Sequence, residues 1–141
     1  MNKYYLDVEN YGKKAREVAA EGCVLLKNDG ETLPIRKGDQ VAVFGRGMLN
    51  YYKSGLGSGG LVNTTHVVSI LDALLEEDEI ELNKSLLEAY EGWSNNNPIN
   101  HGEGWGKVPW SQKEMQLDED LVKEAAQTST MAIVISARTA G

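Results

Sequence analysis

Cysteine is almost absent from this chain, and so are several features that mark particular classes of protein. Cys23 stands alone in 141 residues, which excludes an internal disulfide and a cysteine-rich metal cluster. Its apolar neighbours in EGCVLLK predict a buried thiol with a structural role. No apolar run approaches the roughly 20 residues of a membrane span, so we expect no membrane partner. The polar start MNKYYLDVEN lacks the apolar core of a signal peptide, which predicts a cytoplasmic protein.

Positive charge is also scarce. The chain has 14 Lys and Arg against 21 Asp and Glu, a formal net charge of -7. Contacts with phosphate need clustered Lys and Arg, so this balance argues against a nucleic-acid partner. The two histidines, His66 and His101, have no companion ligands nearby in the sequence, so we expect no bound metal and no resident cofactor.

The segments that are present alternate between helix-like and strand-like patterns. Short apolar runs predict buried strands at QVAVFG and MAIVIS. Apolar side chains at helical spacing, or acidic residues and Asn at a helix start, predict four helices. These lie within residues 10–29, 67–77, 82–93 and 117–129. The apolar run CVLL at residues 23–26 fits either a strand or a helix end. The alternation predicts an α/β layer fold with a mainly parallel sheet, in one domain over residues 1–141.

A stretch of residues 92–112, GWSNNNPINHGEGWGKVPWSQ, breaks this pattern. It is rich in Asn, Gly and Trp and has no helix or strand period, which predicts a long loop. A loop of that length inside a domain is usually functional or disordered.

A glycine-rich stretch, KSGLGSGG at residues 53–60, also contains the pattern G-x-G-x-x-G. It fits a nucleotide loop, a plain flexible turn, or a loop that holds another ligand. A dinucleotide site needs its glycines directly after the first strand, whereas Gly55 follows Gly45, the end of that strand, by ten residues. The phosphate-binding pattern G-x-x-x-x-G-K-[ST] is absent. These observations disfavour a nucleotide and leave the other two open.

The order of the segments resembles the α/β sandwich domain of glycoside hydrolase family 3. Beta-glucosidases of that family have a helix running into L-L-K-N, then L-P, a strand ending in F-G or I-G, and a G-x-G-S-G loop before a helix. The matching segments here are AREVAAEGCVLLKNDGETLPI, VAVFG, GLGSGG and the final AIVISARTAG. The resemblance implies a three-layer α/β/α sandwich. It also implies the N-terminal part of a member with reversed domain order, incomplete at its C-terminus.

The same resemblance implies a part in a retaining beta-glucosidase that hydrolyses O-glycosidic bonds. Such an enzyme uses a nucleophilic carboxylate and an acid/base carboxylate about 5 Å apart. In the family the nucleophile is an Asp on a (β/α)8 barrel, and the acid/base is a Glu on the sandwich that follows a segment like SARTAG. We therefore expect no catalytic residue within this chain, which alone is expected to be inactive. Glu103 is the one candidate substitute, and it also fits a solvated loop carboxylate.

By resemblance, the glycine-rich stretch lies at the mouth of the sugar pocket. Ser58 would hydrogen-bond a hydroxyl of a β-glucoside or oligosaccharide, because one hydroxyl can both donate and accept. Gly57, Gly59 and Lys53 would shape the same loop. The aromatic residues near both loops fit either sugar contact or local packing. They are Tyr51, Tyr52, Trp93, Trp105 and Trp110.

Two further hypotheses stay open. One is a noncatalytic carbohydrate-binding or interaction module of the same fold, and the other is a nucleotide-binding α/β protein. A sandwich that lacks its barrel would also expose the apolar surface that meets it, which predicts self-association.

Overall fold

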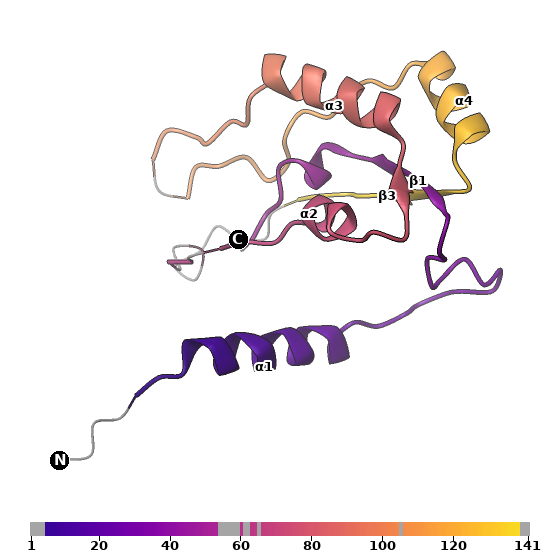
Figure 1. Cartoon of the computed structure of the whole chain (residues 1–141). Coiled ribbons are helices and arrows are strands. Elements are labelled where there is room, and N and C mark those ends of the chain that lie inside the picture. The colour runs from indigo at the N-terminus through magenta and orange to yellow at the C-terminus, as the bar shows by residue number, and fades with distance from the viewer. Residues whose placement is uncertain (1–4, 54–59, 61–62, 65, 105, 139–141) are drawn as a thin grey trace. The chain divides into compact units, whose positions relative to one another are not determined.

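A parallel sheet forms the centre of the larger of two units into which the chain divides. The computed structural model describes residues 5–53, 60, 63–64, 66–104 and 106–138. The smaller unit spans Met1–Leu33 and the larger Pro34–Gly141. Figure 1 shows the elements of both.

The sheet has the strand order β2-β1-β3, in which the central β1 pairs in parallel with both neighbours. The strands are β1 (Gln40–Phe44), β2 (Glu81–Leu82) and β3 (Met131–Val134). The middle of β1 is buried on both faces, as expected for a short apolar strand at the centre of a parallel sheet. The expected parallel sheet is confirmed.

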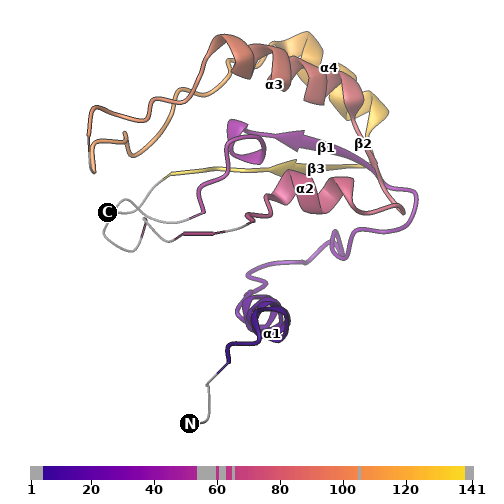
Figure 2. The ribbon, with the colours of Figure 1, turned by 60° about the vertical axis from the view of Figure 1, so that its left-hand side comes forward.

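Helices cover both faces of this sheet, which makes the three layers of the expected sandwich (Figures 1 and 2). The helices α3 (Lys84–Asn96) and α4 (Glu119–Thr128) lie on one face, and α2 (Ile70–Leu75) lies on the other. The connections from β1 to β2 and from β2 to β3 run in opposite directions across the sheet. Right-handed crossovers then place their helices on opposite faces.

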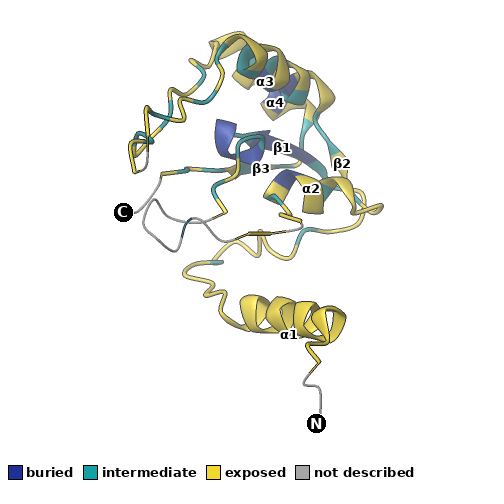
Figure 3. Ribbon diagram, turned by 90° about the vertical axis from the view of Figure 1, so that its left-hand side faces the viewer, coloured by how far each residue is buried: buried dark blue, intermediate teal, exposed yellow. Residues whose placement is uncertain are grey.

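Local sequence signals fix where these helices begin. The Asn83 side chain accepts a hydrogen bond from the Leu86 N–H at 3.0 Å, which confirms the expected N-cap of α3. Ser69 and Asp72 form a capping box at the start of α2. The packed interior joins β1 to all three helices (Figure 3). Its buried apolar residues are Val41, Ala42, Val43, Met48, Leu71, Leu86, Tyr90 and Ala125.

Two sequence expectations about this unit are corrected. The helix α3 continues to Asn96, so the long loop begins at Asn97 and not at Gly92. The Asn96 side-chain amide donates to the Gly92 carbonyl, which satisfies a backbone group in the last turn. The strand β3 is only half-buried, and Val134 is 76% exposed. It lies at an edge of the described sheet, where Met131 and Ile133 pack against the core and the alternate side chains, Ala132 and Val134, are exposed.

The smaller unit contains one helix, α1 (Val8–Glu21), capped by Asp7. In α1, all of whose residues are described, no side chain is buried (Figure 3). The helix ends before CVLL, which forms neither a strand nor a helix end. Cys23 is exposed, so the expected buried thiol is wrong. Burial needs a second apolar layer, and a single helix within residues 1–33 does not supply one.

Among the described residues, no helix is both long enough and apolar enough to cross a bilayer.

Two aspartates of the larger unit, the exposed Asp72 and the partly buried Asp39, are held by hydrogen bonds. Hydrogen bonds from the Ser69 backbone N–H and hydroxyl lower the pKa of Asp72. Hydrogen bonds from the Arg36 N–H and the Thr130 hydroxyl lower the pKa of Asp39. Each carboxylate therefore stabilises the fold only while it is ionised.

We expect these aspartates to make the fold acid-sensitive. A lowered folded-state pKa adds stability above the unfolded pKa of about 4, and this stability is lost as the pH falls through the folded value. The cost of Asp72→Asn, measured by urea unfolding, should therefore shrink between about pH 5 and pH 2. The control is Asp78→Asn, at an exposed turn position. An Asp72→Asn cost that stays constant over this range would contradict the assignment.

Candidate functional site

The carboxyl ends of β1 and β3 meet at one edge of the sheet. Phe44 pairs with Val134, and the Ile135 N–H donates to the Phe44 carbonyl at 2.8 Å. Directly beyond, Gly45 adopts a φ of 105°, and a Cβ there would lie 2.1 Å from the Ile135 carbonyl oxygen. In open parallel sheets, ligands bind outside the carboxyl ends of the strands. This edge is therefore the candidate site.

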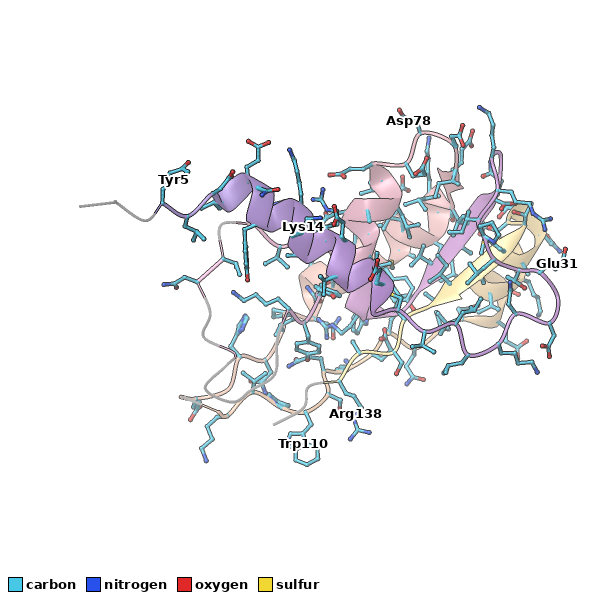
Figure 4. All side chains as sticks on the ribbon, turned by 90° about the horizontal axis from the view of Figure 1, so that it is seen from below. Tyr5, Lys14, Glu31, Asp78, Trp110 and Arg138 are labelled. Carbon is cyan, nitrogen blue, oxygen red and sulfur yellow. The ribbon has the colours of Figure 1, made fainter. Side chains whose placement is uncertain are left out.

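Three loops gather at this edge (Figure 2). They are the chain after β1, the chain after β3, and the loop between α3 and α4. The first turns through the short helix η1 (Arg46–Met48) and leads toward the glycine-rich stretch. Figure 4 shows Trp110 and Arg138, from the other two, on the same side of the larger unit, with Asp78 opposite.

The buried Tyr90 of α3 contacts the turn that follows β1. Its hydroxyl oxygen accepts a hydrogen bond from the Gly45 N–H at 2.9 Å. Burial raises the pKa of Tyr90, and the nearby negative charge of Glu114 adds to this rise, while the bond from Gly45 opposes it. The phenol therefore stays neutral and fixes the start of the loop.

Arg46 is a buried residue, only 4% exposed to solvent. Its side chain joins the loops at this edge of the sheet. Its guanidinium donates to the Asn50 side chain at 3.1 Å and to two backbone carbonyls. These carbonyls belong to Lys113, at 2.6 Å, and Asn97, at 2.7 Å. The guanidinium also lies 4.9 Å from the centroid of the Trp93 ring. Arg46 is not among the site residues predicted from the sequence; the available signal is a cation between two glycines directly after a buried strand.

The first two backbone N–H groups after β1 already have acceptors. The Gly45 N–H donates to Tyr90, and the Arg46 N–H donates to the Glu114 carboxylate at 2.9 Å. A dinucleotide would need free donors at this first turn, opening a helix toward its pyrophosphate. The observed turn instead enters a three-residue 3-10 helix. This geometry weighs against the nucleotide hypothesis.

Of the four sugar-binding residues predicted from the sequence, the structure describes only Lys53. Gly57, Ser58 and Gly59 lie outside the described residues. Lys53 is exposed, and its ammonium donates to the Thr64 hydroxyl at 3.2 Å. Because Lys53 begins the glycine-rich stretch and Thr64 follows it, this bond joins the two ends of the segment that contains it.

The other candidates lie on the surface or have no described partner. Glu103 is exposed between two glycines of positive φ, Gly102 and Gly104, as a solvated loop carboxylate would be. Trp110 is 64% exposed, and Trp105 lies outside the described residues. The buried Tyr52 hydroxyl has no hydrogen-bond partner among the described residues.

The histidines do not form a metal site in the part of the chain that the structure describes. Both His66 and His101 are exposed. Within the described ranges, no group of three or more His, Cys, Asp or Glu side chains is placed to hold a metal ion.

Comparison with known proteins places this arrangement in one family. The family model of the glycosyl hydrolase family 3 C-terminal domain matches residues 23–141. A beta-glucosidase from Ruminococcus albus is 52% identical over 136 residues, which are 96% of this chain and 14% of that protein. Beta-glucosidase A from Butyrivibrio fibrisolvens is 35% identical over 126 residues, again 14% of its length.

Solved structures agree with the sequence matches. A beta-glucosidase from Paenibacillus barengoltzii is 48% identical, with a TM-score of 0.88 over 100% of this chain and 15% of that one. Beta-glucosidase 3B from Thermotoga neapolitana, solved with alpha-D-glucose, is 27% identical, with a TM-score of 0.82 over 96% of this chain and 19% of that one. This chain thus spans less than a fifth of each of these relatives. The chain belongs to glycoside hydrolase family 3.

Proposed function

We propose that residues 1–141 supply part of the sugar pocket of a retaining beta-glucosidase. The observation that carries this proposal is the match to beta-glucosidases along nearly the whole chain. The geometry supports it, because the loops of the larger unit meet at the carboxyl edge of the sheet, where open α/β sheets bind ligands. The substrate class is a β-glucoside or a β-linked oligosaccharide.

Within this proposal, Ser58 hydrogen-bonds a sugar hydroxyl. Gly57 and Gly59 allow the backbone to approach the ring, and Lys53 closes the loop through Thr64. The nucleophile and the acid/base lie outside residues 1–141, the nucleophile on a (β/α)8 barrel that completes the pocket. This proposal gives Glu103 no catalytic role, because its side chain is exposed in the loop as a solvated carboxylate would be.

The first test is hydrolysis of p-nitrophenyl β-glucoside by the full-length protein, with and without Ser58→Ala. Loss of one neutral hydrogen bond of about 0.5–1.5 kcal/mol predicts that kcat/KM falls by roughly twofold to thirteenfold. Gly30→Ala, at an exposed glycine whose added Cβ meets only a side-chain atom at 3.9 Å, is the control and should leave kcat/KM unchanged.

The second test is the same assay on residues 1–141 alone, which should be inactive. Hydrolysis by this chain would contradict the proposed division of roles, and Glu103 would be the first residue to replace. Binding of β-linked oligosaccharides without hydrolysis by the full-length protein would instead support a noncatalytic carbohydrate-binding module.

A further inference from the structure

The guanidinium of Arg46 is a buried cation whose described hydrogen bonds all go to neutral oxygens. These are a side-chain amide oxygen and two backbone carbonyls. Among the described residues, no carboxylate forms an ion pair with it; the Glu114 carboxylate accepts from the Arg46 backbone instead. A buried charge without an ionic partner is costly, and packing alone could be provided by an apolar side chain. What distinguishes Arg46 is the set of segments that its three nitrogens join.

Two of the hydrogen bonds from Arg46 hold the base of the loop between α3 and α4. Asn97 is the first residue after α3, and Lys113 lies 16 positions later; their carbonyls accept from the two terminal nitrogens of Arg46. The Lys113 ammonium also donates to the Asn97 side chain at 3.0 Å. Farther out, Asn100 and Gln112 exchange two hydrogen bonds, at 2.8 and 2.9 Å. The base of this loop is therefore closed and anchored on Arg46.

The third hydrogen bond from Arg46 holds the chain that leads into the glycine-rich stretch. The Nε of Arg46 donates to the Asn50 side chain, and the Ser94 hydroxyl of α3 donates to the same oxygen at 3.4 Å. Three residues after Asn50 comes Lys53, whose bond to Thr64 joins the two ends of the segment that contains that stretch. One guanidinium thus fixes the starting points of two loops at the candidate site.

We propose that Arg46 is a positioning residue that holds the loop of residues 97–113 and the segment of residues 49–53 in one fixed arrangement around the sugar pocket. This inference rests on the proposed function for the identity of the ligand. The planar fork of Arg can reach three acceptors in different directions, while its flat face stacks on Trp93. A Lys has one nitrogen on a flexible stem and cannot keep all three contacts at once.

The test that needs no activity is hydrogen–deuterium exchange of the full-length protein, comparing wild type with Arg46→Lys. Exchange should become faster in residues 49–53 and 97–113, while β1 and β3 keep their protection. Asn50→Ala, which of the three hydrogen bonds from the Arg46 guanidinium removes only the one to the Asn50 side chain, should speed exchange in residues 49–53 alone. Arg16→Lys, an equivalent change at an exposed position on α1, is the control and should change neither segment.

The companion test is steady-state hydrolysis of p-nitrophenyl β-glucoside by the same variants. A misplaced binding loop predicts that Arg46→Lys raises KM about tenfold and changes kcat by less than about threefold. Unchanged exchange in both segments would overturn the proposal, as would faster exchange throughout β1 and β3, which marks a general packing role. Faster local exchange with an unchanged KM would overturn the link to the sugar.

Different results would refute the proposed beta-glucosidase function and the positioning role of Arg46. Absence of β-glucoside hydrolysis in the wild-type protein would refute the proposed function. The exchange pattern of Arg46→Lys and Asn50→Ala would still decide whether Arg46 positions both loops. If Arg46→Lys does not fold, Asn50→Ala decides: local acceleration in residues 49–53 supports the arrangement, and unchanged exchange overturns it.

Discussion

Replacing Gly45 with alanine is expected to destabilise the larger unit by about 3 kcal/mol or more. Gly45 has a φ of 105°, and an added Cβ would lie 2.1 Å from the carbonyl oxygen of Ile135. That oxygen belongs to the backbone directly after β3, so it cannot move aside without disturbing the register of β1 and β3. Urea unfolding measures the loss as a lower midpoint.

The matched control for this change is Gly92→Ala in α3. Gly92 is exposed in the interior of the helix, and an added Cβ there meets no atom within 4 Å. Alanine in a helix interior is more stable than glycine by about 0.8–1.0 kcal/mol, so this variant should gain stability. Equal stability of Gly45→Ala and the wild-type chain would show that β1 and β3 do not approach each other as described.

Removing the Tyr90 side chain is expected to have the second large effect. Tyr90 is 1% exposed, and its hydroxyl accepts from the Gly45 N–H within the core. Tyr90→Ala should cost about 3–5 kcal/mol, as other buried aromatic residues do, because it leaves a cavity. Tyr90→Phe should cost about 1–3 kcal/mol, because it leaves the buried N–H without an acceptor.

The two Tyr90 variants separate packing from hydrogen bonding in the same unfolding assay. Tyr11→Phe, at a position that is 67% exposed, should match the wild type and serves as the control. A Tyr90→Phe variant as stable as the wild type would mean that the Gly45 N–H finds another acceptor, and Tyr90 would then act through packing alone.

Much of the fold is predictable from short patterns. The apolar run of QVAVF is a sufficient signal for a central parallel strand, because both faces of such a strand are buried. Asn83 is recognisable as an N-cap because its bond to Leu86 is local. The segments that resemble family 3 are equally local, which is why they identify the family without knowledge of the packing.

Features that depend on distant partners are not predictable in this way. Whether MAIV is fully buried depends on neighbours that no local pattern specifies, and β3 proves half-exposed. The end of α3, although rich in Gly and Asn, stays helical where Trp93 packs on Arg46. Tertiary packing here overrides a weak helix propensity.

The hydrogen bonds of Arg46 and Tyr90 at the candidate site are the clearest example of contacts that a local pattern does not predict. Arg46 and its partner Lys113 are 67 positions apart, and Gly45 and Tyr90 are 45 apart. No spacing rule within a single sequence connects such residues. Ser58 is predicted to bind sugar only through the family resemblance, since its residue type alone also fits an ordinary flexible turn.

The most direct test of the central claim is hydrogen–deuterium exchange of the full-length protein with and without saturating glucose. The proposed sugar pocket predicts slower exchange in residues 53–60 when glucose is bound, and little change in α1 or α4. Absence of protection anywhere within residues 1–141, in a protein that demonstrably binds glucose, would contradict the claim that this chain contributes to the sugar site.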